Sequence, residues 1–324
     1  MKHFLIRAAL FGGLHLAIFV GFFVASQRHP DPFIGMLRTK HAFADSQESP
    51  RLLLVGGSSF VFGVDSEELA RRLPYHPVNL AVHAGLGLDF ILQDALSAVR
   101  SGDLVVLSLE YSLFGRAEPT LEMWEGLLSR PQVALDMDPR FLGNEGLQFV
   151  AHVVRRGRRT LLGFGPRTDL GIYGPSSFNV FGDVVAHRSL GAYEHGPAFL
   201  SWQNIAPDDP AIIAEGMRRL SAFVIACRLR GARVIAVCPP VPDSIWRIDY
   251  DAISRVVEGE RAVLGADMVE SLNDIPLPLE DFYDTIFHLT GPAAARRTEK
   301  LIAAIRVHEG IAPHPGNSQS GNAR

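Results

Sequence analysis

The chain has 324 residues, enough for one or two domains of about 150 residues each. Hydrophobic residues make up 47% of it and charged residues 20%, which is sufficient for a large apolar core. The net charge is -4 and no long basic stripe is present, so nucleic acid is not expected as the main partner. The only two cysteines, Cys227 and Cys238, exclude a disulfide-dense scaffold. Both are expected to be small core residues, with one bridge between them as the alternative.

The N-terminal segment, residues 1–26, predicts a transmembrane helix. Lys2 and Arg7 precede Ala8–Ser26, which contains no Asp, Glu, Lys or Arg, and roughly 20 such residues cross a bilayer. An uncleaved anchor is favoured because the apolar run is longer than a typical signal-peptide core. The alternative is a signal peptide cut near Val24–Ser26. The basic residues before the segment favour a cytoplasmic N-terminus, which places the globular part in the periplasm or another extracytoplasmic space.

The globular part is expected to begin with a strand and a tight turn. Residues 27–50 are polar and rich in proline, and are expected to be a linker. Arg51–Asp65 then combines an apolar run, a glycine–serine turn and a helix start. Gly57 and its neighbour let the turn adopt unusual angles and leave backbone N–H groups free to point at an anion. A helix follows over Ser66–Leu73, with Asp65 as its N-cap.

Further strand and helix patterns alternate over residues 51–310. The other predicted strands are Pro77–Val82, Asp103–Leu109, Arg233–Cys238 and Ala266–Val269. The other predicted helices are Asp89–Val99, a long one from Asp208 to just before Gly231, Tyr250–Leu264 and Pro292–Val307. Residues 311–324 are expected to be a disordered tail. The alternation predicts an α/β fold with a parallel sheet and right-handed crossovers.

One stretch, Gly115–Trp202, breaks this alternation and is expected to be an insertion after the third strand. Helix is predicted around Leu121–Leu128 and Gly146–Val154. The basic run Arg155–Arg159 is expected to be a solvated helix end, with contact to phosphate or anionic lipid as the alternative. Ser177–Asp183 is expected to be either a turn that lines the site or a plain loop.

Polar residues follow the strands at the points where a site is expected. Gly56–Ser58 follow the first strand, Asn79–Gly87 contains the end of the second, and Asp284 and His288 precede the last helix. Ligands bind at the carboxyl ends of the strands in open parallel sheets, so a serine there lies where chemistry can occur. The order of these motifs resembles the SGNH/GDSL hydrolase superfamily, in particular its membrane-anchored esterase- and acyltransferase-like branches.

The resemblance covers residues 51–110 and 211–307, but not the insertion, and it implies a three-layer α/β/α fold with a flavodoxin-like sheet. It also implies a serine mechanism. Ser58 matches the nucleophile, with Ser59 as its rival, since either hydroxyl can face the cleft. His288 matches the general base and Asp284 the carboxylate that orients the imidazole. The backbone N–H groups of Ser58 and Gly85 match oxyanion donors.

Two positions depart from the family pattern. Asp284 lies four residues before His288 rather than three, and Thr285 occupies the usual place. Glu110 follows the third strand where the family supplies an oxyanion asparagine, and an ionised carboxylate there would repel a developing oxyanion. Glu110 is therefore expected to be protonated, turned away or in another role, such as pairing with an arginine. Tyr111 is the candidate substitute donor.

The first expectation is a membrane-anchored serine esterase or O-acyltransferase that forms an acyl-Ser58 intermediate. Its expected substrates are acyl esters, including those of cell-envelope or extracellular polysaccharide. One alternative is a catalytically degenerate fold that binds glycan during polysaccharide assembly, and another is a scaffold whose insertion binds a protein. No cofactor or metal is expected, because His and Cys lack ligand spacing and no complete phosphate-binding glycine motif occurs. The sequence does not predict the oligomeric state.

Overall fold

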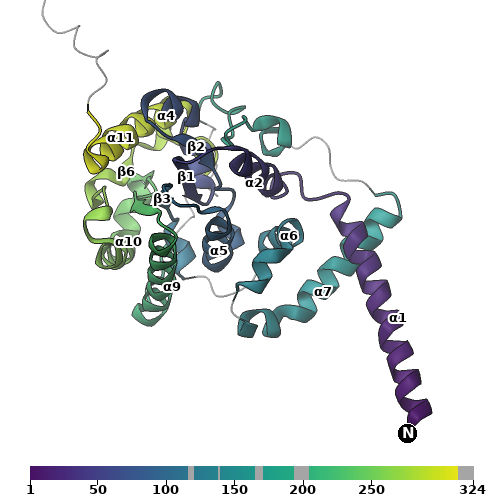
Figure 1. The fold of residues 1–324 in the computed structure, drawn as a ribbon. Coiled ribbons are helices and arrows are strands. Elements are labelled where there is room, and N and C mark those ends of the chain that lie inside the picture. The colour runs from purple at the N-terminus through teal and green to yellow at the C-terminus, as the bar shows by residue number, and fades with distance from the viewer. Residues whose placement is uncertain (116–119, 138, 165–170, 193–203, 313–324) are drawn as a thin grey trace, which may run out of the picture.

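The computed structural model of the protein describes residues 1–115, 120–137, 139–164, 171–192 and 204–312, and of 139–145 only the backbone (Figure 1). The helices are α1 (Lys2–Gln27), α2 (Met36–Ser46), α3 (Ser58–Gly63), α4 (Ser66–Arg72), α5 (Leu88–Ala98), α6 (Leu121–Ser129), α7 (Pro139–Leu161), α9 (Pro210–Leu229), α10 (Asp243–Leu264) and α11 (Gly291–Glu309). The strands are β1 (Arg51–Gly56), β2 (His76–Asn79), β3 (Leu104–Ser108), β4 (Arg233–Ala236), β5 (Val241–Pro242) and β6 (Pro276–Leu277).

Four parallel strands form the central sheet in the order β2-β1-β3-β4. Leu53 of β1 pairs with Val78 of β2 on one side and Val105 of β3 on the other. Every residue of β1 and β3 is buried. Such continuous apolar strands are typical of parallel sheets that are covered on both faces. The predicted α/β class with a parallel sheet is confirmed.

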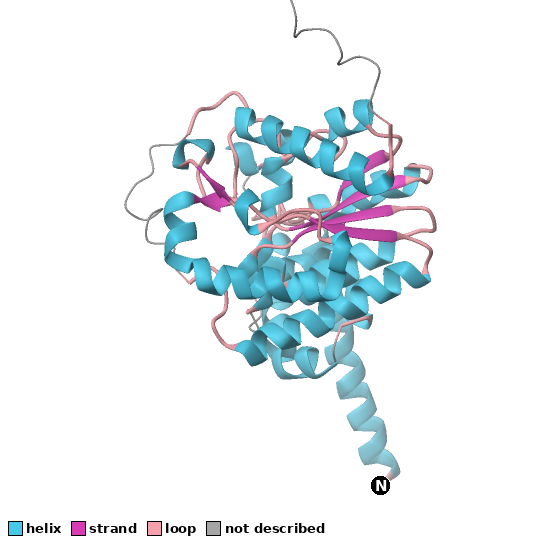
Figure 2. Ribbon diagram, turned by 90° about the vertical axis from the view of Figure 1, so that its left-hand side faces the viewer, coloured by secondary structure: helices cyan, strands magenta, loops and turns pink. Residues whose placement is uncertain are grey.

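Helices lie on both sides of this sheet (Figure 2). In Figure 1, α4 and α11 lie above the strands, whereas α5 and α9 lie below them and pack against each other. Asp65 is the N-cap of α4, as predicted, and its carboxylate accepts hydrogen bonds from two N–H groups of the first turn. All four strands run in one direction, so their carboxyl ends lie together at one edge, where the candidate site residues gather.

The segment expected to be a linker contains a packed helix, α2. Leu37 and Ala44 on this helix are 1% and 0% exposed, and α2 contacts β2, α5 and α6. Lys40 is also buried, and its ammonium donates a hydrogen bond to the Ala81 carbonyl oxygen. Burial lowers the pKa of Lys40 to about 7, although Asp183 acts in the opposite direction. Part of the predicted linker is therefore a packed helix, and Pro30, Pro32 and Pro50 lie outside it and do not interrupt it.

Several element boundaries differ from those predicted. β2 ends at Asn79, before the predicted end of this strand at Val82. The predicted fifth strand is a single bridge between Ala236 and Met268. α10 begins at Asp243, directly after the proline-rich run Pro239–Pro242, and the backbone angles of Asp249 (φ -104°, ψ 17°) mark a kink within it. The run itself contributes β5, which pairs with β6 in a small second sheet.

The N-terminal helix α1 is long and apolar enough to cross a membrane, with a mean hydropathy of 2.1. The insertion contains α6 and α7, which confirms helix at both predicted places. Cys227 and Cys238 are buried free thiols, so the alternative of a bridge is not realised. The part of the predicted tail over 313–324 lies outside the described residues.

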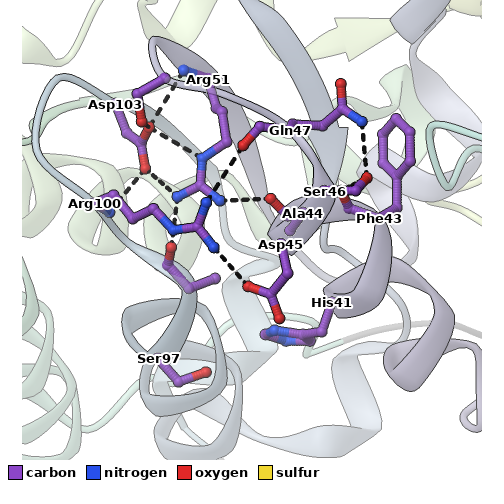
Figure 3. A network of polar contacts seen from close by, with 12 residues as sticks. His41, Phe43, Ala44, Asp45, Ser46, Gln47, Arg51, Ser97, Arg100 and Asp103 are labelled. Carbon is purple, nitrogen blue, oxygen red and sulfur yellow. Dashed lines mark hydrogen bonds and ion pairs between the residues drawn. The ribbon is translucent and has the colours of Figure 1, made fainter.

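A buried ion pair fixes the amino ends of β1 and β3 (Figure 3). Arg51 and Asp103 are both 0% exposed, and Nη2 of Arg51 lies 2.5 Å from Oδ2 of Asp103. The guanidinium also donates to the carbonyl oxygens of Ala44 and Ala98. Asp103 accepts further hydrogen bonds from the N–H groups of Arg51 and Arg100. This network joins α2, α5 and two strands at the edge opposite the candidate site.

Candidate active site

Ser58 lies where β1 ends and α3 begins. Gly57 is the N-cap of α3, and a Cβ at this position would overlap both carboxylate oxygens of Glu110. Ser58 retains 8% exposure, whereas Ser59 is fully buried and its Oγ accepts a hydrogen bond from Arg297 at 3.0 Å. Of the two rival serines, Ser58 is therefore the more exposed one. α3 itself was not predicted, because the sequence indicated only a turn here.

Glu110 holds the two residues that flank Ser58. Its Oε2 accepts from the Gly57 N–H at 2.9 Å, and its Oε1 accepts from the Ser59 N–H at 2.8 Å. Burial raises the pKa of Glu110, although these N–H groups and the Arg297 charge act in the opposite direction. Within the described ranges, the Ser58 N–H has no hydrogen-bond acceptor. Glu110 thus fixes the start of α3 and leaves a single N–H between the two that it binds.

Two adjacent arginines of α11, Arg296 and Arg297, differ in their relation to Glu110. Arg297 is buried, and its guanidinium donates to the Ser59 carbonyl oxygen at 2.8 Å and to the Ser108 hydroxyl at 2.8 Å. Its charge also lowers the pKa of Glu110. Arg296 instead pairs with Asp281, and its side chain is 59% exposed. Arg297 therefore offsets the buried carboxylate and joins α11 to the ends of β1 and β3.

Asp284 and His288 form the expected carboxylate–imidazole pair. Nδ1 of His288 lies 2.7 Å from Oδ1 of Asp284, so the four-residue spacing is compatible with a direct hydrogen bond. The Tyr283 N–H donates to the His288 carbonyl oxygen at 2.7 Å, which closes the turn between them. Burial raises the pKa of Asp284, but the hydrogen bond and charge of His288 lower it by more. The net pKa of Asp284 is therefore below its ordinary value.

Tyr173 is a member of this cluster that sequence reasoning missed. Its hydroxyl donates to Oδ2 of Asp284, the oxygen that His288 does not use, and lies 3.5 Å from Nδ1 of His288. Burial raises the pKa of Tyr173, and the hydrogen bond to Asp284 adds to this effect. Tyr173 belongs to the insertion, just before the segment Ser177–Asp183 that the sequence indicates as a candidate site wall. No local motif in the sequence marks it.

Phe62 connects the histidine to the serine helix. Its ring stacks on His288 with 3.8 Å between the centroids and 10° between the planes. Ser58 and Phe62 are four residues apart on α3, so their side chains lie on one side of the helix, about 6 Å apart. No direct hydrogen bond joins Ser58 to His288 among the described interactions. Such bonds are often long without substrate and tighten when it binds.

Two predicted oxyanion donors are already engaged. The Gly85 N–H donates to Nδ1 of His83 at 2.9 Å, which makes His83 the N-cap of a short 3-10 turn. The Tyr111 hydroxyl is fully buried and donates to the Pro239 carbonyl oxygen at 2.7 Å. In this conformation neither group is free to bind an anion beside Ser58.

His187 lies next to two neighbours of His288, Phe62 and Leu289. Its burial predicts that stability depends on pH. It is fully buried, packs on Phe62, and shares a hydrogen bond with the Leu289 carbonyl oxygen. Burial lowers its pKa from 6.5 to about 4. Between these values only the unfolded chain binds the proton, so the stabilising contribution present above pH 6.5 is lost as the pH falls toward 4.

The loss from His187 alone should be about 3 kcal/mol between pH 6.5 and 4. The free energy of unfolding of the full chain in detergent, measured by urea titration at several pH values, checks this. The variant His187→Gln keeps a donor for Leu289 but does not titrate, so its stability should fall less over this range. Equal slopes for the two proteins would contradict the assignment.

Neither a scan against protein-family models nor a search of curated proteins finds a match for this chain. Within the described residues, no group of three or more His, Cys, Asp and Glu side chains is arranged to hold a metal ion.

Proposed function

We propose that the protein is a membrane-anchored serine esterase or O-acyltransferase with an SGNH-like, flavodoxin-like fold. The observation that carries the proposal is the Asp284–His288 hydrogen bond of 2.7 Å beside the helix that begins with Ser58. A carboxylate-oriented imidazole next to an accessible serine is the arrangement that activates a hydroxyl for acyl transfer. The strand order β2-β1-β3-β4 agrees with the flavodoxin-like layout.

In the proposed reaction, Oγ of Ser58 attacks the acyl carbonyl carbon while Nε2 of His288 takes the hydroxyl proton. Asp284 stabilises the resulting imidazolium through Nδ1, and Tyr173 holds the carboxylate in place. The Ser58 N–H faces the developing oxyanion. His288 then returns the proton to the departing alcohol, which leaves an acyl-Ser58 ester. Water or a sugar hydroxyl attacks this ester in the reverse sequence and restores the serine.

A second candidate is a catalytically degenerate fold that binds glycan in polysaccharide assembly. It is favoured because the N–H groups that surround Ser58 are already hydrogen-bonded. Glu110 binds those of Gly57 and Ser59, and His83 binds that of Gly85. An oxyanion would then meet a single backbone donor, and removing one donor from such sites costs on the order of 10²–10³ in rate.

Labelling with a fluorophosphonate probe separates the two candidates. The full chain in detergent is exposed to the probe, and the modified residue is located by mass spectrometry in the wild type and in His288→Ala. A single adduct on Ser58 that is lost in the variant supports the enzyme. Folded wild-type protein without an adduct, together with binding of a soluble glycan, supports the degenerate fold.

Removing the Tyr173 hydroxyl should weaken catalysis without affecting substrate binding. Tyr173→Phe loses one hydrogen bond to a charged group, so kcat for an aryl acetate should fall about tenfold while KM is unchanged. Because the hydroxyl lowers the pKa of Asp284, its loss should raise the pKa of that carboxyl. Tyr250→Phe, at an exposed position on α10, is the matched control. Equal kcat values for both variants would exclude a positioning role for Tyr173.

We further propose that α1 is retained as an anchor, with the globular domain outside the cytoplasm. The candidate cleavage site of the alternative signal peptide includes Ala25 and Ser26, which are buried at 2% and 1% exposure within the helix. A signal peptidase needs an accessible segment, so this packing favours retention. Intact mass measurement of the protein from a membrane fraction tests it.

A further inference from the structure

The long helix of the insertion, α7, has one apolar side that is attached to the rest of the protein. Val153 is fully buried, and Gly157 packs so closely on α1 that a Cβ would overlap the backbone of Phe22. Arg156 forms an ion pair with the buried Glu125 of α6. These contacts hold α7 against α1 and α6, and Figure 1 shows α1 and α7 side by side.

A second apolar stripe on α7 is uncovered in the described structure. Leu147, Val150, Val154 and Leu161 follow one another at spacings of three, four and seven residues, which places them within roughly 60° of the helix circumference. Leu147 is 85% and Leu161 61% exposed. The chain remains apolar past the end of α7, where Phe164 is also 61% exposed. The stripe is therefore larger than an isolated surface leucine.

Three exposed arginines, Arg155, Arg158 and Arg159, lie beside this stripe. An apolar side flanked by basic residues is typical of helices that lie in the interface of a membrane. Contact with phosphate or anionic lipid is the alternative that the sequence alone indicates for this basic run, and its placement next to exposed leucines favours lipid.

The anchor helix sets the height of α7. The 26 residues of α1 measure about 39 Å, and a bilayer has a hydrocarbon core of about 30 Å. α7 contacts α1 at Phe22, about 8 Å along the axis from the end of α1 at Gln27. Arg156 also donates to the His29 carbonyl oxygen just beyond α1. When α1 is centred in the bilayer, its end extends about 4–5 Å beyond the hydrocarbon core, so this crossing lies about 3 Å inside the core, near its boundary with the headgroups.

We propose that α7 is a second membrane contact. Its stripe from Leu147 to Leu161 inserts at the boundary between acyl chains and headgroups of the bilayer that α1 spans. Arg155, Arg158 and Arg159 bind the headgroups of anionic phospholipids there. The contact requires α1 as an anchor but does not depend on the chemistry proposed for Ser58.

Lipid quenching of a fluorophore on the full chain in nanodiscs tests this contact. Leu161→Cys is labelled with an environment-sensitive dye, and Val307→Cys on α11, which is 85% exposed, is the matched control. The native Cys227 and Cys238 are buried, and the labelled wild type serves as the blank. Lipids with a nitroxide near the headgroup should reduce the fluorescence at 161 and not at 307, and aqueous iodide should do the reverse. Leu147→Cys is a second reporter if Leu161→Cys does not fold.

Equal quenching of 161 and 307 by lipid would overturn the proposal, and so would protection of 161 from both lipid and iodide, which would indicate a protein cover. The basic residues are tested by replacing the three arginines with glutamate in the Leu161→Cys background. In discs with phosphatidylglycerol, this change should reduce lipid quenching. The control replaces three other exposed arginines, Arg218, Arg247 and Arg255, with glutamate. This control should leave lipid quenching unchanged. Equal quenching in both triple variants would exclude headgroup binding.

Discussion

Replacing Ser58 with alanine should abolish turnover of acyl esters, with a loss in kcat of roughly four to six orders of magnitude. The hydroxyl that is removed is the accessible one at the start of α3, beside the pair of Asp284 and His288. Without this hydroxyl no acyl-Ser58 intermediate can form, and only the rate enhancement from substrate binding and the oxyanion donor remains. Initial rates with an aryl acetate, together with trapping of the acyl-enzyme, measure the effect.

Ser59→Ala is the matched control for this experiment. Its hydroxyl is fully buried and bonded to Arg297, so its loss should affect stability more than rate. We expect turnover by Ser59→Ala to stay within about tenfold of the wild type. If Ser58→Ala and Ser59→Ala both retain full turnover, the serine mechanism is excluded. If only Ser59→Ala is inactive, the assignment of the nucleophile is wrong.

Replacing Arg51 with methionine should lower the free energy of unfolding by about 3–5 kcal/mol. The change leaves the Asp103 carboxylate buried at 0% exposure without its guanidinium partner. It also removes the hydrogen bonds from Arg51 to the carbonyl oxygens of Ala44 on α2 (Figure 3) and of Ala98 on α5. Urea unfolding of the full chain in detergent, followed by tryptophan fluorescence, measures the loss.

Arg100→Met is the control for Arg51→Met, because it removes a neighbouring ion pair that is exposed to solvent. The Arg100 and Asp45 side chains are 43% and 70% exposed, and such pairs contribute about 0–1 kcal/mol. Adding Asp103→Leu to Arg51→Met should recover part of the stability, since the buried charge is then absent. Equal losses for Arg51→Met and Arg100→Met would show that the buried pair has no special role.

The sheet could be predicted from the sequence because its strands are marked locally. Leu52–Val55 and Leu104–Leu107 are continuous apolar runs between polar turns, and such runs are typical of parallel strands buried on both faces. The Asp284–His288 contact could be predicted for a similar reason, since both residues lie in one short turn. α2 was missed because its buried Leu37 and Ala44 are too few to show a clear period among polar residues.

The surroundings of Ser58 depend on contacts between distant parts of the chain, which a single sequence does not specify. Glu110 binds Gly57 and Ser59 across 53 and 51 residues, so its role in fixing α3 has no local signal. Tyr173 reaches Asp284 from an insertion without regular strand and helix alternation, across 111 residues. The departure at Glu110 did mark an unusual position, although its contacts could be found only from the structure.

Strand β1 separates the stabilising Arg51 network from the proposed catalytic site at Ser58. Arg51 lies at its amino end, and Ser58 follows its carboxyl end, on the order of 20 Å away. Substitutions at that separation without shared partners usually have additive effects on stability. Variants of the Arg51 network should therefore change how many molecules are folded, while the rate for each folded molecule stays the same. Substitutions at the amino ends of the strands can therefore change the free energy of unfolding, in evolution or engineering, without changing the catalytic rate at the carboxyl ends.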